Sequence, residues 1–306
     1  MERTRATGAS DIPAGDWIDR FAPASARPYL RLARLDRPIG TWLLLLPGWW
    51  SIALASSAWP DFWLLALFAV GAVVMRGAGC TVNDIADREF DGRVARTAGR
   101  PIPSGQVSVR QAAVFMVVLL LIGLSVLLQF NGFAIAVGAA SLILVAVYPF
   151  MKRITYWPQA WLGLTFNWGA LLGWAAVHGD LAAPALVLYA AGLFWTLGYD
   201  TIYAHQDKQD DALIGVKSTA LRLGAATKPW LLGFYGVCVV LLAVCGILAD
   251  LAWPFYIALG VAAAHFVWQA RDVALDDGKD CLAKFKSNRD VGLIVFVGIV
   301  AGRAVA

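Results

Sequence analysis

The sequence predicts an all-α protein that crosses a membrane many times, with about nine transmembrane helices. Of its 306 residues, 59% are hydrophobic and only 15% are charged, whereas about a quarter of the residues of an average soluble domain are charged. Apolar runs long enough to span a bilayer recur along the chain. Basic residues are confined to alternate connections between these runs, as expected for a polytopic membrane protein.

Nine apolar runs are predicted to be transmembrane helices, and the last is the shortest. In chain order they are Gly40–Ala58, Phe62–Cys80, Val109–Leu128, Gly132–Phe150, Pro158–Val177, Pro184–Tyr203, Trp230–Ala249, Leu251–Ala270 and Val291–Val305.

The distribution of Lys and Arg predicts the orientation of the spans. With nine spans, every basic residue except Arg303 falls on the same side of the membrane. Cytoplasmic loops retain positive charge, so we expect the N-terminus inside. Residues 1–26 are predicted to be a flexible segment and residues 27–306 a nine-helix transmembrane domain. The basic, apolar stretch Arg27–Arg37 is predicted to lie in the headgroup plane.

The remaining composition argues against several classes of protein. The four cysteines form no Cys-x-x-Cys pair, so we interpret them as packing residues and not as metal or redox groups. No cleavable signal is evident at the start of the chain. The net charge is only +4, and no nucleic-acid partner is expected.

Two acidic clusters carry the chemical information, and both follow a predicted span on the basic side. In the first, Asp84, Asp87 and Asp91 share one face of a helix, and Asn83 lies four residues before Asp87. Like charges at this spacing repel each other, so the cluster needs a cationic partner.

The second cluster repeats the pattern about a hundred residues later. Asp200, Asp207 and Asp211 share a helical face, and Tyr203 lies four residues before Asp207. Carboxylates at a bilayer edge are costly unless a cation lies among them. Two such clusters on one side of the membrane predict a shared cation site.

Basic residues around the clusters indicate an anionic ligand as well. Carboxylates interleaved with Arg and Lys, with no group of histidines, disfavour zinc and favour magnesium bridging a diphosphate. The basic residues concerned are Arg88, Arg93, Arg96, Arg100, Lys152, Arg153, Lys208, Lys217 and Arg222.

Two other interpretations fit part of this pattern. The segment Asp91–Arg96 matches the start of the CDP-alcohol phosphotransferase pattern, but Val109 and Ala113 stand where that pattern needs aspartates. A cation transporter would also contain facing carboxylates. Transporter sites tend to lie near the midplane, whereas these clusters lie at the ends of spans beside many arginines.

The motifs closely resemble those of the UbiA superfamily of intramembrane aromatic prenyltransferases. The first family motif, Asn-x-x-x-Asp-x-x-x-Asp, corresponds to Asn83, Asp87 and Asp91, and the second to Asp207 and Asp211. A Tyr-x-x-x-Lys motif lies between them. Residues 87–105, 148–159, 199–204 and 215–220 are similar to the branch of the family that acts on 4-hydroxybenzoate.

The resemblance implies helices bundled around a central cavity open to the cytoplasmic side, and Mg²⁺-dependent transfer of a polyprenyl group in ubiquinone biosynthesis. The substrates would be a polyprenyl diphosphate, whose tail enters from the membrane lipid, and 4-hydroxybenzoate, attacked ortho to its hydroxyl. By this resemblance the metal ligands are Asn83, Asp87, Asp91, Asp207 and Asp211, and the diphosphate-binding residues are Arg34, Arg96, Arg100, Tyr148 and Lys152.

Three further roles complete the expected site. Asp207 and Asp200 are the expected base or orienting groups, and Tyr203 is expected to assist them. Arg153 is expected to bind the aromatic carboxylate. A different aromatic acceptor, or a membrane cation transporter, remains the alternative function. The expected location is the bacterial inner (plasma) membrane, with the N-terminus and active site facing the cytoplasm.

Overall fold

The computed structural model describes residue 12, residues 15–92 and residues 97–306. Every regular element in this part of the chain is a helix, which confirms the all-α class. The chain packs as two compact units. The first contains the described residues as far as Thr41 together with Val70–Val126, and the second contains Trp42–Ala69 and Leu127–Ala306.

The first unit is built on short N-terminal helices, the later part of α4 and nearly all of α6. Leu32, Ile102, Val107 and Ala112 form one of its buried clusters. The elements of this unit are α1 (Trp17–Phe21), α2 (Arg27–Leu32), the part of α4 (Phe62–Ala86) from residue 70 onward, α5 (Arg88–Asp91) and α6 (Val109–Leu127).

The predicted flexible segment, residues 1–26, lies partly outside the described residues, since residues 1–11 and 13–14 are not described. From Gly15 onward the segment is described and includes α1. Asp16 caps this helix by accepting a hydrogen bond of 3.0 Å from the Asp19 amide. The Trp17 indole donates to the Leu35 carbonyl, which ties α1 to the chain after α2.

The second unit is a bundle of long helices with four short ones between residues 205 and 226. Its elements are α3 (Ile39–Ala55), α7 (Gly132–Ile154), α8 (Pro158–Phe166), α9 (Trp168–His178), α10 (Ala183–Ala204), η1 (His205–Asp207), α11 (Lys208–Ile214), α12 (Thr219–Leu223), η2 (Gly224–Ala226), α13 (Thr227–Leu248), α14 (Trp253–Asp272) and α15 (Gly278–Val305).

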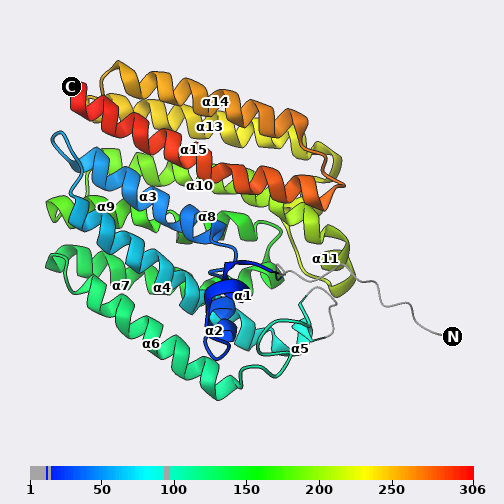
Figure 1. Ribbon diagram of the computed structural model, residues 1–306. Helices are drawn as coiled ribbons and strands as arrows, with labels where there is room; N and C mark the ends of the chain where they lie inside the picture. Colours follow the sequence, from blue (N-terminus) through cyan, green and yellow to red (C-terminus); the bar gives the residue numbers. More distant parts are fainter. Residues whose placement is uncertain (1–11, 13–14, 93–96) are drawn as a thin grey trace. The chain divides into compact units, whose positions relative to one another are not determined.

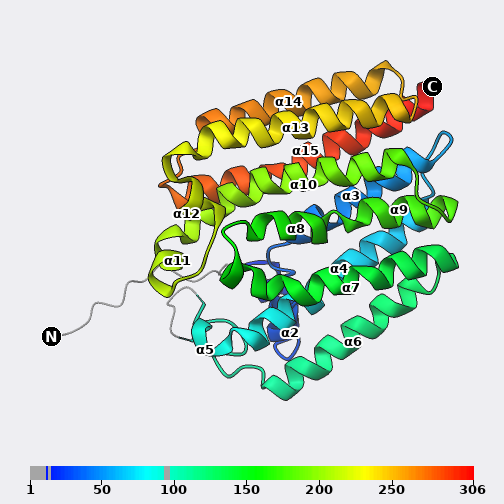
Figure 2. The same cartoon turned by 180° about the vertical axis from the view of Figure 1, so that it is seen from behind.

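Helix α10 lies at the centre of this second unit and packs against α8, α13 and α15. Helices α13, α14 and α15 lie side by side in both views (Figures 1 and 2). Buried tryptophans join the helices through hydrogen bonds, because an indole N–H inside an apolar core requires an acceptor. Trp195 donates to Asn288 Oδ1 at 2.9 Å, and Trp50 donates to the Gly292 carbonyl at 2.7 Å.

One predicted span differs from its expected form. In place of a single helix over Pro158–Val177, the structure has α8 and α9, which are interrupted at Asn167. The Asn167 amide donates to the Gly163 carbonyl and to Thr196 Oγ1, each at 2.8 Å. An Asn side chain that bonds a nearby carbonyl competes with the helical ladder, so this polar contact with α10 accounts for the interruption.

The structure supports several membrane-crossing helices. Over the described residues, five segments are long and apolar enough to cross a bilayer, and α3 is a shorter apolar helix. These five are Phe62–Ala86, Val109–Leu127, Gly132–Ile154, Ala183–Asp207 and Thr219–Leu248. The count of nine spans therefore stays a prediction.

Candidate active site

The first acidic motif continues the hydrogen-bonding pattern of α4 beyond the end of that helix. The Asp87 amide donates to the Asn83 carbonyl at 2.8 Å, and the Asp91 amide donates to the Asp87 carbonyl at 2.9 Å. The three residues therefore keep helical spacing through α5, and their side chains lie along one face. This helical spacing is what the sequence predicted for the first acidic motif.

Asp84 occupies a different place from its acidic neighbours. Its side chain is fully buried, and Oδ1 accepts hydrogen bonds from Arg34 Nη2 at 2.6 Å and Arg100 Nη1 at 3.3 Å. A buried carboxylate requires such compensation because removal from water disfavours its charged form. Asp84 therefore fixes the positions of two guanidinium groups from distant parts of the chain.

The two arginines reach Asp84 in different ways. Arg34 has φ of 59°, in the left-handed region that costs energy for a residue with a Cβ, and its Nη1 donates to the Arg31 carbonyl at 3.0 Å. Arg100 also donates to Asp91 Oδ2 at 2.9 Å. Arg100 thus links the buried carboxylate of Asp84 to Asp91, the last residue of the first acidic motif. Arg96, the third predicted arginine, lies outside the described residues.

The second acidic motif lines a cavity within the second unit. The cavity has a volume of about 210 Å³ and brings together residues from α7, α8, α10, η1, α11 and the following loop. Every site residue predicted in this unit except Arg153 lines it: Tyr148, Lys152, Asp200, Tyr203, Asp207 and Asp211.

Local structure explains how the second motif reaches the cavity. Asp200 and Tyr203 lie in the last turn of α10, Asp207 ends the 3₁₀ turn η1, and Asp211 lies on α11. The Tyr203 ring packs against Phe285 of α15, with 4.5 Å between ring centroids. This contact orients the Tyr203 side chain beside the carboxylates.

The loop between α11 and α12 contributes Lys217 and Ser218 to the cavity wall. Gly215 ends α11 in the left-handed conformation, with φ of 74°, and turns the chain back toward α7. The Lys217 amide then donates to the Lys152 carbonyl at 2.9 Å. Lys217 Nζ donates to the Ile154 carbonyl at 3.1 Å. Two lysines are therefore held next to each other at the edge of the acidic cavity.

A second set of hydrogen bonds joins this loop to α8 and α10. The Thr219 amide donates to Gln159 Oε1 at 3.1 Å, and the Thr219 and Thr201 hydroxyl oxygens lie 2.7 Å apart. All three side chains belong to buried residues. Gln159 and Thr201 thus position the loop through hydrogen bonds that have little competition from water.

Arg153 lies apart from these groups. It is an exposed residue near the end of α7, and it does not line the cavity described above. Lys152 and Arg153 are adjacent in sequence, so their side chains leave the helix in directions about 100° apart. This difference explains why only Lys152 lines the cavity.

The carboxylates of the cavity suit a hard cation that keeps water or phosphate in its shell. Over residues 15–92 and 97–306, no three His, Cys, Asp or Glu side chains lie close enough to hold a metal ion by themselves. Magnesium is usually bound through one or two carboxylates and completed by water and substrate phosphates. The donor set therefore fits Mg²⁺ and not a closed metal cage.

Comparison with known proteins decides the family. A sequence model described as "UbiA prenyltransferase family" matches residues 44–296. The chain belongs to the UbiA prenyltransferase family. This membership confirms the resemblance inferred from the motifs.

Curated relatives in the UbiA family share more than half of their aligned residues with this chain. A Caenorhabditis elegans protein named "4-hydroxybenzoate polyprenyltransferase, mitochondrial" is 53% identical over 95% of the chain and 82% of the relative. A human protein of the same name is 55% identical over 92% of the chain and 76% of the relative. The Arabidopsis thaliana protein of that name is 52% identical, with 96% and 73% covered.

Solved UbiA structures share the fold. The apo structure of a UbiA homologue from Aeropyrum pernix K1 has a TM-score of 0.72 at 25% identity, covering 85% of this chain and 96% of that one. A UbiA homologue from Archaeoglobus fulgidus bound to GPP and Mg²⁺ has a TM-score of 0.61 at 18% identity, with 91% and 100% covered.

The UbiA relatives correct one prediction. The expected location in a bacterial inner membrane is wrong, because the names of the nematode, human and plant relatives place them in mitochondria. Charge asymmetry indicates which loops lie on the same side of a membrane. It carries no information on which membrane that is, so the location could not be read from it.

Several residues of this UbiA chain were missed as site residues by the sequence analysis. Gln159 and Ser218 have no distinctive spacing, and the only signal in the sequence was their place in the stretches 148–159 and 215–220 that resemble the family. Asp84 offered a signal, because Cys80 and Thr81, four and three residues earlier, are small side chains on the same helical face, and the structure shows that both are buried. That face points inward, so a carboxylate that continues it must be buried and paired.

Proposed function

We propose that this chain transfers a polyprenyl group from a polyprenyl diphosphate to 4-hydroxybenzoate, at the ring carbon ortho to the hydroxyl, in ubiquinone biosynthesis. The relatives named for this activity match more than nine-tenths of the chain at 52–55% identity. The observation that carries the proposal is the cavity of the second unit, where three carboxylates and two lysines come together.

The proposed magnesium ligands are Asn83, Asp87 and Asp91 for one ion and Asp207 and Asp211 for a second. When bound, Mg²⁺ supplies Lewis-acid stabilisation of the departing diphosphate. The solved homologue with GPP and Mg²⁺ supports this choice of metal, as does the mixture of carboxylates with basic residues. A divalent ion allows an acidic cavity to accept an anionic headgroup that bare carboxylates would repel.

Basic side chains neutralise the remaining charge of the diphosphate in this proposal. Lys152 lines the cavity of the second unit, and its neighbour Lys217 extends the set. Arg34 and Arg100 serve the same purpose in the first unit, where Asp84 orients both guanidiniums. Tyr148 also lines the cavity and donates its hydroxyl to a diphosphate oxygen. Arg96 completes the proposed set.

The reaction itself needs a leaving group, an electron-rich ring and a base. The C–O bond of the polyprenyl diphosphate ionises towards an allylic cation, and the ring carbon ortho to the hydroxyl attacks that cation. The carboxylate of Asp200 or Asp207 then accepts the ring proton, and Tyr203 orients that carboxylate. Apolar walls exclude water, which would otherwise trap the cation. Arg153 is the proposed partner of the acceptor's carboxylate.

The protein works, in this proposal, as a nine-span enzyme of a mitochondrial membrane. The helices at each of the nine predicted ranges and the compartment named for the relatives support this view. A cation transporter, the earlier alternative, is disfavoured by membership of a family of transferases. A different aromatic acceptor within the same family is the remaining alternative.

The test is a transfer assay in membranes, with radiolabelled 4-hydroxybenzoate, a polyprenyl diphosphate and Mg²⁺. We expect a lipid-soluble product that EDTA abolishes and excess Mg²⁺ restores. Asp207→Asn and Asp87→Asn should each lower the rate at least about a hundredfold, as losses of more than one strong transition-state contact do. Asp276→Asn, which changes an exposed loop carboxylate, is the matched control.

Two results would overturn the proposal. Product formation at the normal rate in EDTA would rule out the proposed metal requirement. Near-normal turnover of Asp207→Asn would rule out the proposed site. A panel of other aromatic acids, assayed with the same donor, separates the two acceptor hypotheses. Preference for another ring by more than about tenfold in kcat/KM would identify a different branch of the family.

A further inference from the structure

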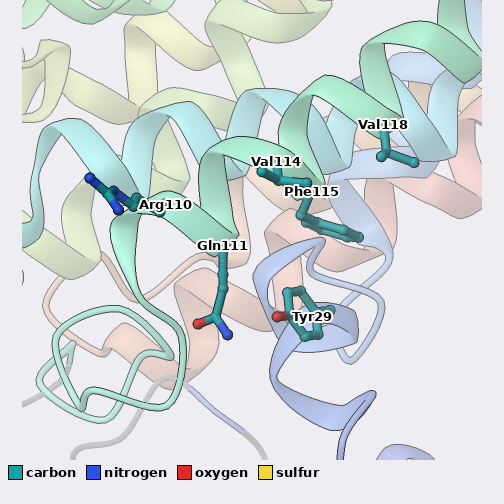
Figure 3. Close-up of a pocket in the computed structure, with 6 residues that line it drawn as sticks. All are labelled: Tyr29, Arg110, Gln111, Val114, Phe115 and Val118. Atoms are coloured by element: carbon teal, nitrogen blue, oxygen red, sulfur yellow. The ribbon is translucent and has the colours of Figure 1, made fainter.

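A groove separate from the acidic motifs runs along α6 in the first unit. It has a volume of about 490 Å³ and is open along its side. Figure 3 shows Phe115 directed from α6 toward the Tyr29 ring of α2, with Val114 just before it and Val118 farther along the helix. The Tyr29 and Phe115 rings lie 5.3 Å apart between centroids. The groove thus has an aromatic floor and an aliphatic rim.

The N-terminal end of this groove is cationic. Arg110 is the second residue of α6, and no acidic residue occupies the first turn of that helix. The aligned peptide dipoles also place partial positive charge at a helix N-terminus. Over the described residues, the Arg110 guanidinium makes no hydrogen bond or ion pair. A cation in this position is unfavourable for the helix unless an anion compensates it.

The side of α6 that borders the groove is apolar and exposed. Only 6% of the most apolar window of α6 is buried inside the protein, although the helix is long and apolar enough to cross a membrane. Val114 is 66% exposed and Val118 is 47% exposed. From Arg110 to Val118 the helix rises about 12 Å. This length matches part of one acyl chain that hangs from a headgroup held at Arg110.

We propose that this groove binds an anionic membrane phospholipid, with its phosphate at Arg110 and one acyl chain between Tyr29, Phe115 and Val118. The Gln111 side chain lines the same end. Its Oε1 accepts from the Ser108 amide at 2.9 Å, so its NH₂ group is the part directed to a ligand. The proposal does not depend on the function proposed above.

The charge of the headgroup must decide which lipid the groove prefers. An acyl chain gains little by moving from bulk lipid to an apolar groove, because both surroundings are equally apolar. Attraction between one Arg and an anionic lipid, by contrast, corresponds to about a fivefold preference. Two lipids with identical chains and different headgroup charge therefore separate the proposal from non-specific lipid contact.

The experiment uses the full chain in nanodiscs and measures relative association constants by spin-label spectroscopy. The probes are phosphatidylglycerol and phosphatidylcholine carrying the same spin-labelled chain. We expect the wild type to prefer the anionic probe at one site by about fivefold, and high salt to weaken this preference. Arg110→Gln should remove the preference, and Val114→Phe, which narrows the groove, should lower occupancy by both probes.

The matched control is Lys228→Gln. Lys228 is also the second residue of a long apolar helix, α13, but its Nζ already donates to the Arg271 carbonyl at 2.9 Å. We expect this variant to keep the wild-type preference. The proposal is overturned if Arg110→Gln binds the anionic probe as the wild type does. It is also overturned if Lys228→Gln loses as much of the preference for the anionic probe as Arg110→Gln does. A wild-type dimer that Val114→Phe converts to a monomer would identify the groove as a subunit interface instead.

Discussion

Arg34 Nη2 lies 2.6 Å from Asp84 Oδ1, although the two residues are fifty positions apart, and both are buried. This pair holds a predicted diphosphate-binding arginine in a strained left-handed conformation. Asp84 therefore differs in role from the other acidic residues of the first motif. It acts as the anchor of Arg34 and Arg100, while its neighbours remain the proposed metal ligands.

We predict that Asp84→Asn raises the KM for the polyprenyl diphosphate about tenfold, which corresponds to the loss of one well-oriented charged contact. The KM for the aromatic acid should change much less, because the arginines are proposed to bind the diphosphate. Asp84→Glu restores the charge and should recover part of the affinity. Steady-state kinetics in membranes with each substrate varied in turn measures both effects.

The control for this prediction is Glu89→Gln. Glu89 lies in the same segment, is exposed and pairs with Arg88 only at the surface, where such pairs contribute little. It should leave both KM values unchanged. Because removing one partner of a buried pair also destabilises a fold, a thermal melt of each variant is needed. Equal KM values for folded Asp84→Asn and wild type would contradict the positioning role.

A second prediction concerns the loop that carries Lys217. Gln159→Leu leaves the buried Thr219 amide without its acceptor, which costs about 1–3 kcal/mol, and frees the loop from α8. We expect a lower melting temperature and weaker binding of the diphosphate substrate. Gln106→Leu changes an exposed glutamine and should have neither effect. Calorimetry of the purified protein and kinetics with varied diphosphate are the measurements.

A third prediction tests the packing between α10 and α13. A Cβ added at Gly198 would lie 2.1 Å from the Tyr235 ring. That ring cannot move easily, because it stacks on Phe266 and its hydroxyl donates to Gln269 at 2.8 Å. Gly198→Ala should therefore destabilise the fold by about 1–3 kcal/mol, the usual cost of overpacking.

Gly236→Ala on α13 is the matched control for that substitution. A Cβ there meets no atom within 4 Å, and Ala favours a helix over Gly by about 1 kcal/mol. We expect this variant to melt at the wild-type temperature or slightly above it. If Gly198→Ala melted at the same temperature as Gly236→Ala, the close approach of α10 to Tyr235 would not exist in the folded protein.

A fourth prediction concerns pH. Burial raises the pKa of the Asp36 carboxyl, although Arg37 and Arg34 oppose the shift, and Asp16 adds to it. The folded state therefore holds this proton to a higher pH than the unfolded chain does. Its contribution to stability is complete below the unfolded pKa of about 3.9 and is lost as the pH rises through the folded pKa.

Asp36→Asn removes the loss of stability that Asp36 causes as the pH rises. The variant should melt higher than the wild type at neutral pH, and the difference should shrink toward pH values of about 4. Asp290→Asn alters an exposed carboxylate and should show no such trend. Thermal melts at several pH values check the prediction. A gap in melting temperature that is constant over the whole range would mean that Asp36 does not titrate differently on folding.

Local patterns in the sequence were sufficient for much of the molecule. The apolar runs predicted the positions of the long helices within a few residues, as at Val109–Leu128 against α6. The last run was located less well, because α15 begins at Gly278 and its first half is rich in charged residues. In the second unit, six of the seven predicted site residues line a single cavity, since their helical spacing was already visible in the sequence.

Contacts between distant segments escaped the sequence analysis. The interruption at Asn167 depends on Thr196 of α10, twenty-nine positions away. Gln159 positions the loop because it accepts a hydrogen bond from the Thr219 amide, sixty positions away. Neither residue has a periodicity or a motif that would reveal its partner, because a hydrogen bond between helices is set by how those helices pack.

By itself, the sequence determined the helical class, the family and the positions of both acidic motifs, because hydrophobicity, charge and short spacings act over a few residues. Only the tertiary structure decided that Asp84 turns inward to Arg34 and Arg100 and that Lys217 lies beside Lys152. The reason is that the environment of a charged side chain, and hence its role, is created by the segments that fold against it.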